Sequence, residues 1–464
     1  MNPLAAPPAF DEAVAPENLP PGLLDVLSPY VGVLVVAFLV SVVATPLLRT
    51  LAVRNGIVDA PDLLRKNHAV PVAYLGGVAI FLGFAVAVIA ITAFPGVGGF
   101  GQGGSARLAV SRPMVPFPLS ILAGAAVVTI TGLFDDVFGI RARVKVGGQL
   151  FAAAALSYDN IGVHLIENGL LVFGVPYKEL NAFSVFGSPL GESLVYAAGT
   201  FLIAVMVLGA CNSVNLLDGL DGLASGVVAI AMGGFLVLAL ITAARSGAGD
   251  GVLMLQLRDP VRIVCCLATI GAILGFLPYN FRPASIFMGD AGSLLLGYLC
   301  AATILLFSDT GSQALLMVTA ALIVFAVPIT DTSLAIIRRK LRGMPLFAPD
   351  NQHIHHLLRR SGLSVRQSVL VMYAAGVAFA ALGVGMVVAE LQWRYVLVVF
   401  CLLYGTIMAT AFKYGSLQHE LDLQRSQRRG REDSTPEKLP EVPEPDEPAP
   451  LSAEAEGEVN SAGA

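Results

Sequence analysis

Three groups of aspartates stand at the ends of long apolar segments, where they could bind a divalent cation. Asp135 and Asp136 are adjacent in LFDDVFGIRARVK, and Asp290 lies in FMGDAGSLLLG. A polar residue recurs at every third position of CNSVNLLDGLDG, at Asn212, Asn215, Asp218 and Asp221. On a helix, this spacing would place all four on one side. Mg²⁺ is commonly held by one or two carboxylates together with substrate phosphate oxygens. The pattern therefore predicts a magnesium and phosphate site.

Basic and histidine side chains accompany the aspartates. Lys145 follows the aspartate pair, Lys66 lies in an earlier polar loop, and NQHIHHLLRRSG contains His353, His355 and His356. The H-x-H-H pattern could also bind a transition metal, but no cysteine accompanies it and carboxylates favour a hard ion. We interpret these groups as contacts for phosphate or nucleotide, with a zinc site and a purely structural loop as the alternatives.

The composition indicates which elements must position these residues. Of 464 residues, 56% are hydrophobic and only 13% are charged, and the mean hydropathy is +0.75. Soluble domains carry about 25% charged residues, so an ordinary soluble enzyme is excluded. Long apolar runs predict an all-α polytopic membrane protein with about 11 transmembrane helices. The predicted segments are roughly 30–50, 74–94, 116–134, 145–158, 194–211, 222–244, 262–279, 292–308, 313–334, 368–389 and 393–412.

The distribution of basic residues predicts the orientation. With the N-terminus outside and the C-terminus cytoplasmic, about three quarters of the 28 lysines and arginines lie in inside loops. All three aspartate groups then lie at the cytoplasmic face. Each could alone be a helix cap or an interhelical hydrogen-bonding motif, but their shared side favours a site. The longest outside loop, 159–192, could hold a small extracytoplasmic β-hairpin with its turn at Glu167-Asn168-Gly169.

We expect three parts in the chain. Residues 1–28 are predicted to be a flexible extracytoplasmic tail without a signal peptide. Residues 29–413 form the multi-span domain, and residues 414–464 form a disordered cytoplasmic tail that is first basic and then acidic and proline-rich. The net charge of −5 gives no reason to expect nucleic acid. There is no G-x-x-x-x-G-K-[ST] motif, so ATP-driven transport through a P-loop is not indicated.

Together, these motifs resemble those of the polyprenyl-phosphate N-acetylhexosamine-1-phosphate transferases, which form glycosyltransferase family 4. DAPDLLRKNHAVPVAYLGG, DDVFGI, NSVNLLDGLDGLASG, NFRPASIFMGDAGSLLLG and NQHIHHLLRRSG occur in order over roughly residues 30–412. The resemblance implies transfer of a sugar-1-phosphate from a UDP-N-acetylhexosamine, UDP-GlcNAc by its H-I-H-H loop, to undecaprenyl phosphate. The products would be a polyprenyl-diphosphate sugar and UMP, and Mg²⁺ would be needed, with Mn²⁺ as a substitute. Such an enzyme initiates cell-envelope glycan synthesis at the cytoplasmic face of the bacterial inner membrane.

The resemblance also implies roles for single residues. The catalytic residues would be Asp135, Asp136 and Asp290, and the Mg²⁺ ligands would be Asp290 and Asp218. The nucleotide sugar would be bound by Asn212, Asn215, Asp218 and Asp221, and its phosphates by Lys66 and Lys145. Uridine would contact Asn280 and Phe287, whereas the diphosphate and sugar would contact His353, His355 and His356.

Several alternatives stay open at this point. The lipid phosphate could attack the sugar-linked phosphorus directly, or an aspartate could first form a covalent phospho-enzyme. Within the enzyme class, the alternative is a phospho-MurNAc-pentapeptide transferase of peptidoglycan synthesis. A transporter or a lipid-carrier-binding protein is the main non-enzyme alternative, although a transporter predicts carboxylates near span centres and on both faces. The protein could also form a homodimer.

Overall fold

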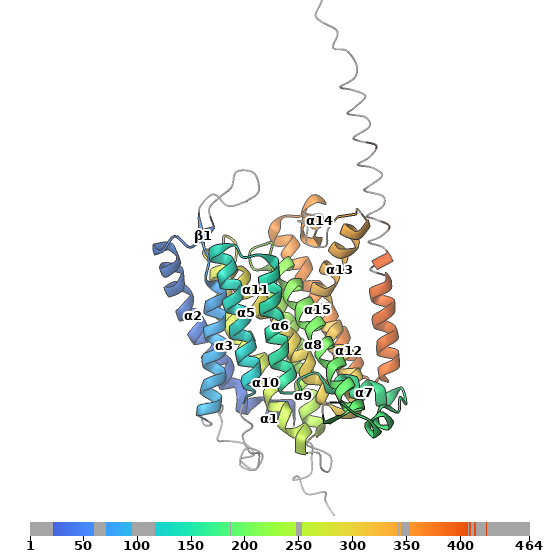
Figure 1. Cartoon of the computed structure of the whole chain (residues 1–464). Helices are drawn as coiled ribbons and strands as arrows, with labels where there is room; N and C mark the ends of the chain where they lie inside the picture. The colour runs from blue at the N-terminus through green and yellow to red at the C-terminus, as the bar shows by residue number, and fades with distance from the viewer. Residues whose placement is uncertain are drawn as a thin grey trace, which may run out of the picture. The chain divides into compact units, whose positions relative to one another are not determined.

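A computed structural model describes residues 22–59, 71–94, 117–185, 187–246, 253–341, 343–344, 353–406, 408–409, 413 and 424. The predicted loop that contains Lys66, most of the N-terminal tail and nearly all of the C-terminal tail lie outside these residues. Contacts within the chain define two units, Met1–Phe412 and Lys413–Ala464. In the first unit, the long helices run side by side along one axis (Figure 1).

The described residues are mostly helical. The α-helices are α1 (Leu23–Leu27), α2 (Val31–Arg54), α3 (Gly76–Ala93), α5 (Leu119–Phe138), α6 (Ala142–Tyr158), α7 (His164–Val172), α8 (Leu190–Leu217), α9 (Leu223–Ser246), α10 (Leu253–Asn280), α11 (Gly289–Leu306), α12 (Ala314–Val324), α13 (Ala326–Leu341), α14 (Ile354–Arg360), α15 (Val365–Val388) and a last helix over Trp393–Thr406. The 3₁₀ helices are η2 (Ser28–Tyr30), η4 (Tyr177–Ala182), η5 (Phe307–Asp309) and η6 (Gly311–Gln313). Two antiparallel strand pairs complete the structure, β1 (Val58–Asp59) with β2 (Val72–Ala73) and β3 (Ser184–Val185) with β4 (Ser188–Pro189).

The protein is an all-α polytopic membrane protein. Among the described residues, eight helices are long and apolar enough to cross a membrane, and α12 with α13, bent by 72°, would make a ninth span. Helices suit a bilayer because they satisfy their own backbone hydrogen bonds. Each of the eleven predicted segments overlaps a helix, but α6 has only 17 residues and the last apolar helix is also short. The number eleven therefore stays a prediction.

Helix α11 is the centre of the bundle. Every residue from Ala291 to Leu306 is buried, and the helix contacts α3, α5, α8 and α9. By contrast, outer helices expose large apolar side chains such as Leu47 of α2 and Phe201 of α8, as expected for surfaces that face lipid. A fully surrounded helix is a rigid support, and its first residues include Asp290.

The loop of residues 159–192 differs from the prediction. Glu167, Asn168 and Gly169 do not form a hairpin turn, because they lie inside α7. The Asn168 amide donates to the Ser308 carbonyl at 3.0 Å, and the Glu167 carboxylate accepts from the Tyr177 hydroxyl at 2.8 Å. These tertiary contacts favour the helix over the turn. The strand pair in this loop is instead β3 with β4. At the N-terminus, residues 23–27 are helical, whereas a flexible tail was expected.

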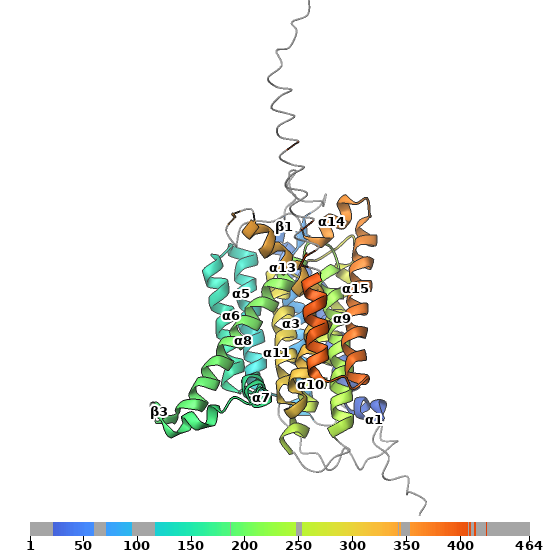
Figure 2. The same ribbon diagram turned by 90° about the vertical axis from the view of Figure 1, so that its right-hand side faces the viewer.

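The segments that connect the long helices lie at the two opposite ends of the bundle. Helix α14 and strand β1 mark one end, the site end, whereas α7 and β3 mark the other (Figures 1 and 2). The β1–β2 pair is also tied to the start of α11, because Ala73 forms a bridge with Ile286. The polar connections of the site end are therefore held together by backbone pairing.

We expect labelling from outside the cell to distinguish these ends. In a Cys401→Ser background, which removes the exposed native thiol, Lys178→Cys should react with a membrane-impermeant maleimide in intact cells. Arg359→Cys on α14 should react only after the membrane is opened. Both positions are exposed, so a difference would report the side of the membrane. The reverse pattern would overturn the predicted orientation.

Candidate active site

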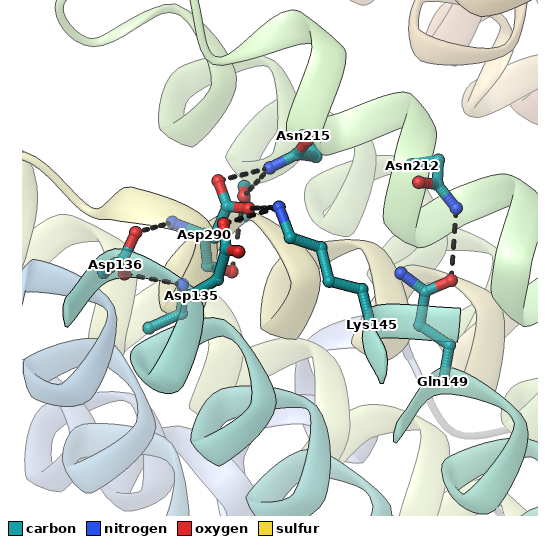
Figure 3. Close-up of polar contacts among 9 residues, drawn as sticks. Asp135, Asp136, Lys145, Gln149, Asn212, Asn215 and Asp290 are labelled. Atoms are coloured by element: carbon teal, nitrogen blue, oxygen red, sulfur yellow. Dashed lines mark hydrogen bonds and ion pairs between the residues drawn. The ribbon is translucent and has the colours of Figure 1, made fainter. Parts of the chain in front are cut away.

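The aspartate groups meet at the site end of the bundle. Asp135 and Asp136 come from the last turn of α5, Lys145 from the first turn of α6, Asn215 from the end of α8, and Asp290 from the start of α11 (Figure 3). Four helices thus contribute their ends to one cluster. The prediction that the three aspartate groups share one end of the spans is confirmed.

Lys145 lies between two carboxylates. Its ammonium is 2.5 Å from Asp135 Oδ2 and 2.6 Å from Asp290 Oδ2. The three side chains are 17 to 27% exposed, so the cluster is open to a ligand but partly shielded from water. One positive charge faces two negative charges, which leaves an excess negative charge that a cation can compensate.

Asp136 acts differently from its neighbour. Its carboxylate accepts hydrogen bonds from the backbone N–H groups of Asp290 at 2.7 Å and Ala291 at 3.1 Å. It therefore caps the N-terminus of α11, where unpaired N–H groups and the helix dipole favour an anion. Gly289 has φ +65°, and a Cβ at this position would lie 2.4 Å from Asp136 Oδ2, so a side chain there would displace the cap. Asp136 positions Asp290, whereas Asp135 is available to a ligand.

The polar repeat of α8 does not stay on one helical face. Helix α8 ends at Leu217, Asp218 is its C-cap residue, and Asp221 lies in the turn before α9. The condition under which all four residues would share one side of a helix is therefore not met beyond Leu217. The chain turns at Gly219 and at Gly222, which has φ +76°, a conformation that glycine adopts without a steric penalty.

Three members of the repeat, Asn212, Asn215 and Asp221, have different side-chain partners. The Asn215 amide donates to Asp290 Oδ1 at 2.8 Å and to Ser293 Oγ at 2.9 Å. The Asn212 amide donates to the Gln149 side chain at 3.1 Å (Figure 3). Asp221 accepts from the Ala284 N–H at 3.3 Å, so it fixes the connection between α10 and α11. Asn215 thus belongs to the carboxylate cluster. Asn212 instead contacts α6, and Asp221 contacts the α10–α11 connection.

Asp218 has a carboxylate without a hydrogen-bond or ion-pair partner in the part of the chain that the structure describes. Burial, and then the charges of Asp290, Asp136 and Asp221, raise the pKa of Asp218 to about 8. The same charges that make a second carboxylate unfavourable would favour a bound cation. The Mg²⁺ role of Asp218 stays a prediction, and the electrostatic influence of Asp290 on Asp218 supports it.

The donor set fits a Mg²⁺ ion that is shared with substrate. Among the described residues, no three histidine, cysteine or acidic side chains form a ready-made metal cage. Mg²⁺ does not need one, because it keeps several waters and binds one or two carboxylates together with phosphate oxygens. Asp290 and Asp218 can supply these carboxylates, and Asp135 is available nearby.

A buried aspartate holds the histidine loop. Asp331 of α13 is fully buried, and its carboxylate contacts His353 Nδ1 at 2.9 Å and the Ile354 N–H at 2.8 Å. Sequence reasoning missed Asp331 because it lies in a segment counted as a span. The signal was nevertheless present, since a carboxylate within an apolar run is costly unless it has a function or a partner.

His355 is held over the Asp218–Asp221 turn. Within the described residues, neither ring nitrogen has a hydrogen-bond partner, although the residue is only 1% exposed. A Cβ added to Gly219 would lie 2.5 Å from His355 Nε2, so the ring lies directly on this turn. Burial, and then the positive charge of His356, lower the pKa of His355 to about 4. The imidazole is therefore neutral at pH 7.

The two residues with an implied uridine role lie on the connection to α11. Phe287 is half-buried and its ring is 6.3 Å from that of Tyr74. Asn280 is 2% exposed; its side-chain oxygen accepts from the Gly222 N–H at 3.1 Å, and its amide donates to the Ile286 carbonyl at 3.1 Å. Asn280 therefore joins α9 to this connection, and its contact with uridine stays a prediction. Lys66 lies outside the described residues.

The sequence is similar to a known protein family and to several curated proteins. Residues 118–308 match the family model described as glycosyl transferase family 4. A Bacillus subtilis (strain 168) protein named probable undecaprenyl-phosphate N-acetylglucosaminyl 1-phosphate transferase is 34% identical over 380 residues, which cover 80% of this chain and 89% of the relative. An Escherichia coli (strain K12) undecaprenyl-phosphate alpha-N-acetylglucosaminyl 1-phosphate transferase is 29% identical over 79% of this chain and 87% of its own length. A Mycobacterium tuberculosis (strain ATCC 25618 / H37Rv) decaprenyl-phosphate N-acetylglucosaminephosphotransferase is 34% identical over 73% of this chain and 77% of its own length.

The fold and the site define a polytopic membrane protein with an acidic, lysine-containing centre at one end of its helices. The chain belongs to glycosyl transferase family 4.

The different contacts of the adjacent aspartates predict different effects on stability. Asp136→Ala removes the cap of α11 and should destabilise the protein by roughly 0.5–2 kcal/mol, the usual cost of losing such a cap. Asp135→Ala should cost less, because Lys145 keeps its contact with Asp290. Thermal unfolding can be followed with a thiol-reactive dye that reports the four buried cysteines. Equal losses of Tm in the two variants would contradict the capping role.

Proposed function

We propose that the protein transfers GlcNAc-1-phosphate from UDP-GlcNAc to undecaprenyl phosphate, giving undecaprenyl-diphosphate-GlcNAc and UMP. The observation that carries this proposal is the cluster of Asp135, Lys145, Asp218 and Asp290 at the end of an apolar bundle. The names of the B. subtilis, M. tuberculosis and E. coli relatives support the same donor sugar and a polyprenyl phosphate acceptor. We place the site at the cytoplasmic face of the inner membrane, where a lipid acceptor and a water-soluble donor can meet.

The proposed reaction is a direct displacement at the sugar-linked phosphorus of UDP-GlcNAc. An oxygen of the lipid phosphate forms a new P–O bond, and the bond from this phosphorus to the bridging oxygen breaks, so that UMP leaves with that oxygen. A phosphate monoester has a second pKa of about 6, so it is already a dianion at neutral pH. The transfer then needs positioning and charge neutralisation more than deprotonation.

The contacts of the chain favour direct attack over a phospho-aspartate. Both oxygens of Asp136 accept backbone hydrogen bonds, and Asp135 pairs with Lys145, so each carboxylate is a weaker nucleophile than a free one. Lys145 can offset phosphate charge, and Asp290 and Asp218 would hold Mg²⁺. When bound, Mg²⁺ would neutralise the charge that develops on the phosphate oxygens.

The proposed function is tested with purified protein, undecaprenyl phosphate and a panel of radiolabelled UDP-sugars. We expect label from UDP-GlcNAc to enter the lipid phase together with stoichiometric release of UMP. UDP-MurNAc-pentapeptide tests the peptidoglycan alternative, and a donor labelled in uridine is the control because its label should stay in water. Absence of lipid-linked sugar with every donor would refute the transferase proposal.

Removal of divalent cations should abolish this transfer. A chelator should eliminate activity, and Mg²⁺ or Mn²⁺ should restore it, because both are hard cations that suit carboxylate and phosphate oxygens. Zn²⁺ should not restore it. The measurement is the initial rate of lipid labelling after each addition, and full activity in excess chelator would exclude the metal role of Asp290 and Asp218.

Substitutions should separate metal binding from donor binding. Asp290→Asn should lower kcat by about a hundredfold or more, equivalent to about 2.7 kcal/mol, because it removes charge needed in the transition state. Asp221→Asn should act mainly on the KM for UDP-GlcNAc, because Asp221 contacts the connection that carries Phe287 rather than the Lys145 cluster. Steady-state rates at saturating Mg²⁺ measure both effects. A near-normal kcat for Asp290→Asn would remove its assignment as metal ligand.

A further inference from the structure

A pocket of about 460 Å³ opens near the carboxylate cluster but shares no residue with it. Arg282 and Pro283 come from the connection between α10 and α11, Arg359 from the end of α14, and Ser364, Val365 and Arg366 from the start of α15. Each of these three segments therefore contributes one arginine, and Arg282 is more than 70 positions from the other two. Helices α14 and α15 lie at the site end of the bundle (Figures 1 and 2).

The described residues provide no acidic partner for the arginines of this pocket. None of its six lining residues is acidic. In the described part of the chain, the guanidinium groups of Arg282, Arg359 and Arg366 have no hydrogen-bond or ion-pair partner, whereas Arg49 nearby donates to the Ser285 carbonyl at 3.1 Å. Like charges that converge on one cavity repel each other, and an anion between them would remove this repulsion.

The start of α15 adds to the positive potential. Ser364 caps the helix: its Oγ accepts from the Gln367 N–H at 3.3 Å, and its own N–H donates to Gln367 Oε1 at 2.8 Å. The cap fixes the position of the first turn, so the positive end of the helix dipole lies at Val365 and Arg366 in the pocket wall. The anion-binding groups thus include a fixed helix end as well as exposed side chains.

We propose that this pocket binds a phosphate group through Arg282, Arg359 and Arg366. The planar guanidinium matches the geometry of phosphate oxygens and can bind two of them at once. Two molecules can bring a phosphate to this position: the nucleotide sugar and an anionic phospholipid. The second fits the geometry because α10 and α15 are long and apolar enough to span a membrane, and the pocket lies where α10 ends and α15 begins, which a lipid head group can reach.

A bound phosphate would connect two elements that contact the candidate active site. The α10–α11 connection touches Asp221 through the Ala284 N–H, and α14 touches the same turn through His355, which lies on Gly219. Joining Arg282 to Arg359 through a phosphate would hold these elements together on both sides of the Asp218–Asp221 turn. Phosphate binding in the pocket would then make the Asp218–Asp221 turn more ordered, without any contact with the carboxylate cluster.

Binding can be measured without the transfer reaction, so the result is independent of the proposed function. Full-length protein in a neutral detergent is titrated with inorganic pyrophosphate, or with short-chain phosphatidylglycerol and, as a zwitterionic control, phosphatidylcholine. EDTA prevents a divalent cation from bridging pyrophosphate to the carboxylates. The shift of Tm, reported by the buried cysteines, gives the apparent affinity for each probe.

Arg359→Gln and Arg366→Gln should each weaken binding roughly fivefold or more, because each removes a charged hydrogen-bond donor. Arg360→Gln is the matched control: Arg360 is the next residue of α14 and is also exposed, but it does not line the pocket. All three variants should keep the Tm of the unliganded protein, since the substituted side chains are exposed. An effect on pyrophosphate alone would identify the nucleotide sugar as the source of the phosphate, and an effect on phosphatidylglycerol would identify the lipid. If Arg359→Gln and Arg366→Gln bind both probes like the wild type, or if Arg360→Gln loses as much affinity, the proposal is wrong.

Discussion

The site depends on one ammonium group that two carboxylates share. Lys145 brings Asp135 of α5 and Asp290 of α11 within ion-pair distance, and without it the two negative charges would repel each other at the ends of packed helices. The pairing is weak enough to change, because all three side chains are partly exposed and solvent screens them. A substrate phosphate can therefore take over contacts of Lys145, while a cation takes over contacts of the carboxylates. Before substrate binds, the protein thus already holds the ammonium and the two carboxylates close together.

The residues that support the site are different from those that make these exchangeable contacts. Asp136 is bonded to the backbone of α11 rather than to a mobile side chain, and α11 is buried along its length. Asp331 similarly anchors the histidine loop from the interior of the bundle. Lys145 and Asp290, which must meet a ligand, are thus partly exposed, whereas Asp331 and the body of α11, which orient the site, are buried. This is the arrangement expected when catalysis relies on positioning.

The sequence predicted the location of the site better than its internal contacts. The ends of apolar runs are visible without a structure, so the shared end of Asp135, Asp218 and Asp290 could be inferred. The Lys145–Asp290 contact could not, because it joins residues 145 positions apart and depends on how α5 and α8, which both pack against α6 and α11, bring the starts of these two helices together. The Asn-Gly pair at residues 168–169 predicted a turn, but contacts of Asn168 with the distant Ser308 carbonyl stabilise a helix. Local turn preferences are small enough for tertiary packing to override them.

Asp331 shows how a membrane protein can conceal a polar support inside an apparently apolar span. The segment 313–334 predicts one uninterrupted crossing, yet α12 and α13 are bent by 72° between Val324 and Ala326. Because of this bend, α13 continues into the site end of the bundle, where the Asp331 carboxylate meets His353 and the start of α14. An unpartnered carboxylate would be costly at this buried position. The bend therefore places Asp331 where His353 and the Ile354 N–H can be its partners. The same arrangement brings His355 onto Gly219, which means that the order of the Asp218–Asp221 turn depends on a residue more than a hundred positions further along the chain.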